Sequence, residues 1–171
     1  MSAKINFVIE TAVAQDYKHL NYVNKETWLH TYPSESYNIN IADIENLPWN
    51  KFEENWKARL TLPEKDFHCH VAKVDNNIVG FIVCKELPSF ISIGSVYVLP
   101  DYQKLGMGTS LFNHVLKFVS LQKPIEIKVA EYNQKSINFY KKLGFVYLEQ
   151  ISDFQLSENK FIPQIKMILR R

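Results

Sequence analysis

Apolar residues recur at helical spacing in the first third of the chain. Between Ala14 and Tyr32 the apolar residues have roughly helical spacing, which predicts an amphipathic helix with Asp16 as a possible cap; they are Tyr17, Leu20, Val23, Trp28 and Tyr32. A second such pattern covers Trp49 to Leu62 and ends at Pro63. The segment between them, PSESYNINIADIENLP, has a proline at each end and many turn formers, so we expect a long loop over residues 33–48. Long loops in compact domains tend to bind ligands or to cover a site.

The middle of the chain has the patterns of strands. FHCHVAKVDNNIVGFIVCKEL, residues 67–87, alternates on its first arm and is rich in β-branched residues on its second, which predicts two strands joined by a turn at Asn76 and Asn77. FISIGSVYVL, residues 90–99, predicts a third strand. Because Gly94 lies inside that strand, we expect a bulge or a close approach of another backbone there.

The last third alternates between helical and strand patterns. An apolar stripe from Met107 onward predicts a helix, and PIEIKVA, residues 124–130, predicts the next strand. NQKSINFYKKLG, residues 133–144, predicts a short helix with Asn133 and Gly144 at its ends. Two strands, Phe145–Gln150 and Phe161–Leu169, follow. We therefore expect one α+β domain over residues 1–171, with a mixed sheet and helices on both of its faces.

Composition excludes several classes of function. The chain has 171 residues, of which 46% are apolar, which is enough for one sizeable core. Its net charge of +2 and the lack of a basic run argue against a nucleic-acid partner. We also expect no membrane partner and a cytoplasmic protein, because the sequence shows neither a signal-peptide core nor an apolar stretch of about 20 residues. Cys69 and Cys84 lack metal-ligand spacing, so we expect no metal site.

Charge is distributed unevenly along the chain. Residues 33–66 contain seven acidic and four basic side chains, whereas residues 102–171 contain eleven basic and five acidic ones. The acidic stretch could face a cation and the basic end an anion. Alternatively, both are ordinary solvated surface.

The stretch YVLPDYQKLGMGTSLFNHVL, residues 97–116, leads from a strand through two closely spaced glycines into a helix. The first amides of a helix have no partner within it and carry partial positive charge, so a glycine-containing loop at this point predicts an anion site. The alternative is a tight turn with no ligand. The spacing does not fit the nucleotide-binding P-loop, and Leu111 replaces the third glycine of a dinucleotide fingerprint.

Two motifs together resemble one family. VLPDYQKLGMGTSL is similar to the Q/R-x-x-G-x-G/A acetyl-CoA motif of the GCN5-related N-acetyltransferases (GNAT), with Gln103, Gly106 and Gly108 at the fixed positions. NQKSINFYKKLGF resembles the second signature of that family, except that Ser136 replaces the usual alanine. The motifs also follow each other in the family's order, one strand apart.

The resemblance implies acetyl-CoA as co-substrate and α/β/α layers around a mixed, mainly antiparallel sheet that is splayed at the coenzyme. Strand amides would bind the pantetheine arm as an added strand would, and loop amides would hold the pyrophosphate. For Gln103 the alternative is bracing of the turn, and for Asn133 it is helix capping. The coenzyme contacts implied are Val96, Tyr97, Val98, Gln103, Lys104, Leu105, Gly106, Met107, Gly108, Thr109, Asn133, Ser136 and Tyr140.

Tyr140 is the catalytic residue that the resemblance implies. Transfer of an acetyl group to an amine requires a neutral amine, stabilisation of an oxyanion and a proton for the departing thiolate. The matching tyrosine of the family lies near the coenzyme sulfur as its general acid. The alternative role for Tyr140 is packing in the core.

The general base remains open in the sequence, because Ser92 stands where many relatives carry a glutamate on the strand before the glycine loop. Water, Glu26, Glu86 or an acidic residue of the 33–48 loop could take the proton, and His68 and His70 are further candidates, although a strand histidine is more often structural. Glu26, Trp28, Tyr32 and Ser92 are the candidate acceptor-site residues.

We expect an N-acetyltransferase that acts on a primary amine of a small molecule by direct attack in a ternary complex, as a monomer or homodimer. The acidic loop favours a cationic acceptor. Two alternatives remain: an acetyltransferase for protein or peptide amines, which would need a groove open at both ends, and a catalytically silent acetyl-CoA-binding module.

Overall fold

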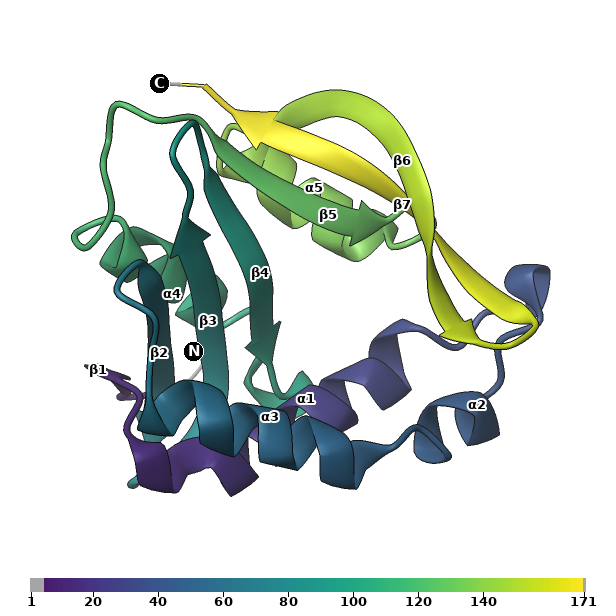
Figure 1. Cartoon of the computed structure of the whole chain (residues 1–171), viewed down its shortest axis with the longest axis horizontal. Coiled ribbons are helices and arrows are strands. Elements are labelled where there is room, and N and C mark those ends of the chain that lie inside the picture. The colour runs from purple at the N-terminus through teal and green to yellow at the C-terminus, as the bar shows by residue number, and fades with distance from the viewer. Residues whose placement is uncertain (1–4, 171) are drawn as a thin grey trace.

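Seven strands form one sheet in a computed structural model that describes residues 5–170 (Figure 1). The strand order is β1-β2-β3-β4-β5-β7-β6, and every neighbouring pair is antiparallel except β4 and β5. The mixed, mainly antiparallel sheet is therefore confirmed, whereas the single domain expected over 1–171 extends past the described residues and stays a prediction. The strands are β1 (Val8–Thr11), β2 (Phe67–Val74), β3 (Asn77–Glu86), β4 (Ile91–Val98), β5 (Ile125–Ala130), β6 (Val146–Ser157) and β7 (Lys160–Leu169).

Helices cover both faces of the sheet, as expected. Helices α4 and α5 pack on one face, where Leu111 and Ile137 join the largest apolar cluster, and α1 and α3 pack on the other, where Leu20 and Trp56 belong to a second cluster. The helices are α1 (Tyr17–Thr31), α2 (Ile41–Glu45), α3 (Trp49–Thr61), α4 (Met107–Val115) and α5 (Gln134–Lys142), with short 3-10 turns at Ala14–Asp16, Glu35–Tyr37 and Pro100–Tyr102. Over the described residues, none of these helices is long and apolar enough to cross a membrane.

The parallel pair β4 and β5 separates after three residues. Ile91–Ile93 pair with Ile125–Ile127, after which β4 continues along β3 and β5 continues along β7. The register of β3 and β4 shifts at Gly94, because Val83 pairs with Ser95 while its neighbour Cys84 pairs with Ile93. Gly94 is thus the extra residue of a bulge, as expected, and the sheet is splayed beyond it (Figure 1).

The segment 33–48 is more ordered than the expected loop. It contains a 3-10 turn and the helix α2, which begins at a reciprocal cap: the Asn40 side chain accepts a hydrogen bond from the Asp43 amide, and the Asp43 carboxylate accepts one from the Asn40 amide. Ile44, which is fully buried, anchors the helix. Five helical residues are too few to show a periodic pattern, so the sequence pattern indicated only turn formers.

Two strand boundaries differ from those expected, and one strand, β1, was not predicted. β1, an edge strand with mostly exposed residues, precedes the helical region. The turn between β2 and β3 lies one residue earlier than expected, where Asp75 and Asn76 have φ of 48° and 65°. β6 continues to Ser157 rather than ending at Gln150. It too is an edge strand with mostly exposed residues, so its second half lacks the alternation of apolar and polar residues that predicts a strand.

The hairpin of β6 and β7 extends beyond the rest of the sheet, and its tip lies next to α2 (Figure 1). Leu156 and Ile162 near its tip join Ile39 and Ile44 of the 33–48 segment in a third apolar cluster. Lys160 forms an ion pair with Asp43 at 2.5 Å. Trp28 of α1 packs against the same cluster, so the hairpin, α1 and α2 are joined.

Candidate active site

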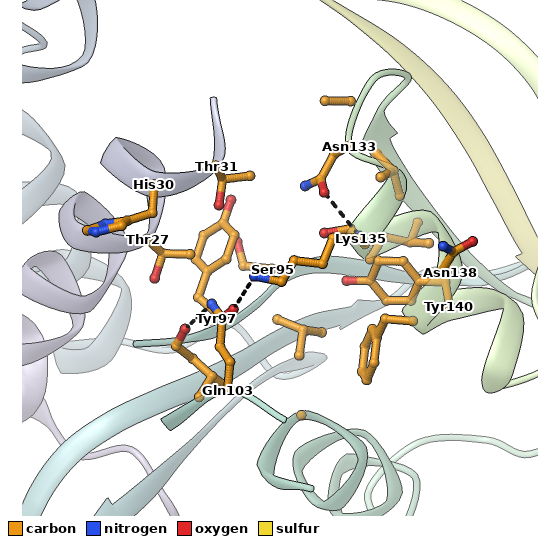
Figure 2. Close-up of a pocket in the computed structure, with 18 of the residues that line it drawn as sticks. Thr27, His30, Thr31, Ser95, Tyr97, Gln103, Asn133, Lys135, Asn138 and Tyr140 are labelled. Carbon is orange, nitrogen blue, oxygen red and sulfur yellow. Dashed lines mark hydrogen bonds between the residues drawn. The ribbon is translucent and has the colours of Figure 1, made fainter. Parts of the chain in front are cut away.

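A cleft of about 1050 Å³ lies where β4 and β5 diverge. Figure 2 shows α1 on one side of it, with Thr27, His30 and Thr31, and α5 on the other, with Lys135 and Tyr140. The loop before α4 and the diverging parts of β4 and β5 complete the lining. Segments far apart in the sequence thus meet around one cavity.

The backbone of β4 is free of a strand partner on the cleft side. The Leu99 amide donates to the Val79 carbonyl at 2.8 Å, and hydrogen-bonding directions alternate along an antiparallel strand. Val96 and Val98 therefore direct their amide and carbonyl groups away from β3 and toward the gap. The Gln103 side chain donates to the Val98 carbonyl, so an extended ligand could pair with the Val96 groups and the Val98 amide as a strand would.

The glycine loop leaves the first amides of α4 accessible. Gly106, with φ of 84°, occupies the position before the helix, and the first intrahelical bond runs from the Ser110 amide to the Gly106 carbonyl. The amides of Met107, Gly108 and Thr109 have no helical partner and lie at the cleft. Their partial positive charge suits a phosphate group.

Gly108 has a second role, because a Cβ there would lie 3.2 Å from the ring of Phe139. A glycine at this position therefore allows α4 to pack closely against α5. The two motifs that the sequence separates by about 25 residues are in direct contact at this point.

Polar side chains brace the loop against its neighbours. Gln103 donates to the Val98 carbonyl at 2.9 Å and accepts from the Lys135 ammonium at 2.9 Å. The Asn133 side chain accepts from the Ser136 amide at 3.0 Å and so caps α5. The structural alternatives for Gln103 and Asn133 are thus realised, and both residues also line the cleft.

The hydroxyl of Tyr140 points into the cleft (Figure 2). Its ring is almost fully buried and packs against Phe139 and Phe145 at centroid distances of 5.0 and 5.5 Å. Burial raises the pKa of Tyr140 well above its ordinary value. The phenol therefore keeps its proton at neutral pH and can donate it.

Aromatic hydroxyls gather on the α1 side of the cleft. The Trp28 indole donates to the Tyr97 hydroxyl at 3.0 Å, and the Tyr32 and Tyr97 hydroxyls lie 3.2 Å apart. The Tyr132 hydroxyl donates to the Tyr32 carbonyl at 2.8 Å. Burial is the main cause that raises the pKa values of both Tyr32 and Tyr97, so this group is neutral. Sequence reasoning placed Tyr97 with the coenzyme and missed its side chain's contacts, which depend on partners more than 60 residues away.

Most of the expected site residues line this cleft. They are Tyr32, Val96, Tyr97, Val98, Gln103, Lys104, Gly106, Met107, Gly108, Thr109, Asn133, Ser136 and Tyr140. Leu105, Glu26, Trp28 and Ser92 are not part of its lining. Trp28 lies behind the surface, where it holds Tyr97, and Ser92 lies in the paired part of β4, before the strands diverge.

None of the acidic or histidine side chains proposed as a base reaches the cleft. Glu86 forms an ion pair with Lys123 at 2.7 Å. His68 and His70 pack with Phe118 at the far end of the sheet, and burial lowers the pKa of His70 to about 4. Among the residues described, the cleft lining contains no carboxylate. Nor do the described residues hold a group of three or more potential metal ligands.

Comparison with known proteins identifies the family. A profile described as "Acetyltransferase (GNAT) family" matches residues 41–145. The N-alpha-acetyltransferase of Sulfurisphaera tokodaii is 34% identical over 120 residues, which cover 61% of this chain and 68% of that protein. The N-alpha-acetyltransferase of Sulfolobus acidocaldarius is 26% identical over 159 residues, which cover 83% and 81%.

Solved structures show the same fold. The PaiA N-acetyltransferase of Thermoplasma acidophilum, in complex with coenzyme A, superposes with a TM-score of 0.77 and 20% identity over 98% of this chain and all of that one. The acetyltransferase yncA of Salmonella typhimurium, with acetyl-CoA, gives a TM-score of 0.68 and 20% identity over 96% and 94% of the two chains. The profile match, the curated relatives and the splayed sheet agree: this chain belongs to the acetyltransferase (GNAT) family and is an N-acetyltransferase that uses acetyl-CoA.

Proposed function

We propose that the enzyme transfers the acetyl group to a primary amine of a small molecule, by direct attack while both substrates are bound. One observation carries the proposal: a single cleft combines a free strand edge and a helix N-terminus with a partly enclosed hydroxyl-lined pocket on its α1 side. The first two features suit the coenzyme, and the pocket suits the acceptor.

The residues present fit acetyl-CoA. Val96 and Val98 offer backbone groups to its pantetheine arm, and the amides of Met107 to Thr109 offer donors to its pyrophosphate. Lys104 and Lys135 lie at the same end of the cleft and add positive charge. When bound, the coenzyme supplies an activated acetyl thioester.

Tyr140 supplies the proton for catalysis in this proposal. Its hydroxyl points into the cleft, and its raised pKa keeps it protonated at neutral pH. It can therefore hydrogen-bond to the sulfur and pass a proton to it as the C–S bond breaks, and it regains a proton from the ammonium that the attacking amine forms. A free amide of β4 donates a hydrogen bond to the developing oxyanion. Because no described carboxylate lines the cleft, the amine loses its proton to water.

The enclosed acceptor side supports a small substrate. The 33–48 segment is held to the β6–β7 hairpin by the Asp43–Lys160 ion pair and by the third apolar cluster. Near the cleft, Tyr37 stacks on Tyr132 at 4.9 Å and donates to Glu131 at 2.6 Å. These contacts fix the 33–48 segment against its neighbours and so favour a compact acceptor over an extended peptide.

A peptide N-terminus is the second candidate acceptor. Two relatives are named N-alpha-acetyltransferase, and one of them matches over most of both chains. The α-amine of a peptide is also a primary amine, so the same residues would perform the chemistry. A peptide acceptor would require the contacts between α2 and the hairpin tip to break, whereas a small amine would not.

Initial rates with a panel of amines and peptides test the proposal. Release of free coenzyme thiol is followed, and the product is identified by its added acetyl group. We expect turnover of small amines, with intersecting double-reciprocal lines, since a covalent acetyl-enzyme would give parallel lines. Turnover of peptides alone would favour the second candidate. Acetyl-CoA binding without any turnover would indicate a silent module.

A further inference from the structure

The cleft is lined by basic side chains, whereas a cationic acceptor would require acidic ones. Its lining includes five basic side chains and, over the part of the chain that the structure describes, no acidic one. The basic residues are His30, Lys104, Lys128, Lys135 and Lys142. The acidic 33–48 segment does not compensate, because Asp43 is paired with Lys160 and no acidic residue of that segment lines the cleft.

Lys128 differs from the other lysines in its position. It is the first residue of β5 after the last pair with β4, Ile93 with Ile127, so it stands where the strands separate. Side chains alternate between the faces of a strand, and Ile127 and Val129 join the cluster under α4 and α5. Lys128 therefore lies on the opposite face, which is the side of the acceptor pocket.

The next residue on that same face confirms the direction. Ala130 belongs to the third apolar cluster, together with Trp28, Tyr32 and Tyr132. Lys128 thus precedes the aromatic group of the acceptor side by two residues along β5. The glycine loop and the N-terminus of α4, which suit the coenzyme phosphates, belong to the other face.

Lys128 forms no ion pair with any of the described residues. Its cross-strand neighbour on β7 is Lys166, and like charges directly opposite each other are unfavourable. Lys166 is balanced by Glu149 at 2.7 Å and Glu126 at 3.6 Å, whereas among the described residues Lys128 forms neither an ion pair nor a side-chain hydrogen bond. A lysine left unpaired beside another lysine, and lining a cleft, suits an anionic ligand.

We infer that the acceptor carries a negative group near its amine, as an amino acid does, and that Lys128 binds that group. The inference rests on the proposed small-amine acceptor. An ammonium on Lys128 would hold the carboxylate while the amine lies toward Tyr140 and the β4 amides. A carboxylate is also the group that a diamine or an amide lacks, so Lys128 would determine specificity rather than take part in the chemistry.

Matched acceptors and charge variants test the inference. The acceptors are the common amino acids, each beside its own C-terminal amide, and a diaminoalkane. For the wild type we expect the best amino acid to exceed its amide in kcat/KM by roughly tenfold, the value of one charge-assisted hydrogen bond. Lys128→Gln should remove that difference by raising the KM of the amino acid alone, and Lys128→Arg should preserve it.

Charge reversal gives a sharper result. Lys128→Glu should shift the preference toward the diamine while coenzyme affinity, measured by calorimetry, stays the same. Lys51→Gln, at an exposed position on α3, is the control and should change neither preference. Equal use of acids and amides, or unchanged selectivity in Lys128→Gln, would overturn the inference and leave the proposed function intact. Turnover of peptides alone, or of no acceptor, would overturn both.

Discussion

The two sides of the cleft are built in different ways. The coenzyme side consists of β4, the glycine loop, α4 and α5, and most of its residues fall within 96–109 and 133–140. The acceptor side is assembled from α1, the 33–48 segment, β5 and the distant β6–β7 hairpin. Its defining contacts join Tyr32 to Tyr132 and Asp43 to Lys160, pairs separated by 100 and 117 residues.

The two sides therefore separate the residues proposed for the acetyl transfer from those proposed to select the acceptor. The proposed mechanism uses only backbone amides and one tyrosine on the coenzyme side, and short local motifs are enough to place them. On the acceptor side, hydroxyls and a lysine are placed by tertiary contacts that can change without disturbing the motifs. We therefore expect substitutions on the first side to alter turnover or coenzyme affinity, and those on the second to alter acceptor KM.

The largest effect is expected for Tyr140→Phe. Removal of the hydroxyl keeps the ring against Phe139 and Phe145, so folding and acetyl-CoA binding should persist, whereas kcat should fall by roughly 10²- to 10⁴-fold. Steady-state turnover beside calorimetric affinity measures this. Tyr22→Phe, on the exposed side of α1, is the matched control. Wild-type kcat in the Tyr140 variant, with chemistry shown to be rate-limiting, would exclude the general-acid role.

A charge at the start of α4 separates binding from folding. Thr109→Asp adds an anion within the first turn, which favours the helix through its dipole but opposes a bound pyrophosphate. We expect acetyl-CoA affinity to fall by roughly tenfold or more while the melting temperature stays the same or rises. Thr109→Asn is the neutral control. Gly108 is a poorer test position, because a new side chain would meet Phe139. Unchanged affinity in a folded Thr109→Asp protein would contradict the phosphate site.

The coenzyme side could be predicted largely from sequence because its signals are local. The glycines of the loop, Asn133 and Tyr140 each lie in a motif whose spacing fixes the backbone around them. The bulge at Gly94 was likewise indicated by a single residue. Leu105 was expected to contact the coenzyme, but it does not line the cleft. The motif predicts the path of the loop backbone and not the direction of each side chain in it.

The acceptor side could not be predicted in the same way. Trp28 was placed in the pocket, but its indole lies behind Tyr97, and only the fold reveals that arrangement. The extension of β6 and the short α2 have exposed or brief sequences without periodicity. Lys128 could not be singled out in the sequence, because a single lysine in a strand is common. Its position in the cleft depends on the separation of β4 from β5, which only the fold shows.

For Tyr97→Phe we expect a moderate increase in the KM for the acceptor and no change in coenzyme affinity. The change removes the hydroxyl that accepts from Trp28 and contacts Tyr32 but leaves the β4 backbone in place. Loss of one such hydrogen bond corresponds to roughly 2- to 12-fold, which should appear in the acceptor KM. Coenzyme affinity should stay constant. A loss of coenzyme affinity with normal acceptor KM would place the Tyr97 side chain on the other side of the cleft.

The smallest effect concerns the contact between α2 and the hairpin. The hydrogen bond from Lys160 is the first cause that lowers the pKa of Asp43, so the pair stabilises the fold above the ordinary carboxyl pKa of about 4, and this contribution is lost as pH falls through the lowered pKa. Asp43→Asn should lower stability by less than about 1 kcal/mol at pH 7 and by a smaller amount near pH 2. Thermal unfolding at the two pH values measures the difference, and an equal deficit at both would show that the charge is irrelevant.

Amide hydrogen exchange with and without acetyl-CoA shows whether the splayed strands and the start of α4 receive the coenzyme. We expect new protection at Val96 and Val98 and at Met107 to Thr109, with no change at Lys128 or Lys160. Protection confined to the α1 and hairpin side, or none at the free edge of β4 under saturating acetyl-CoA, would contradict it.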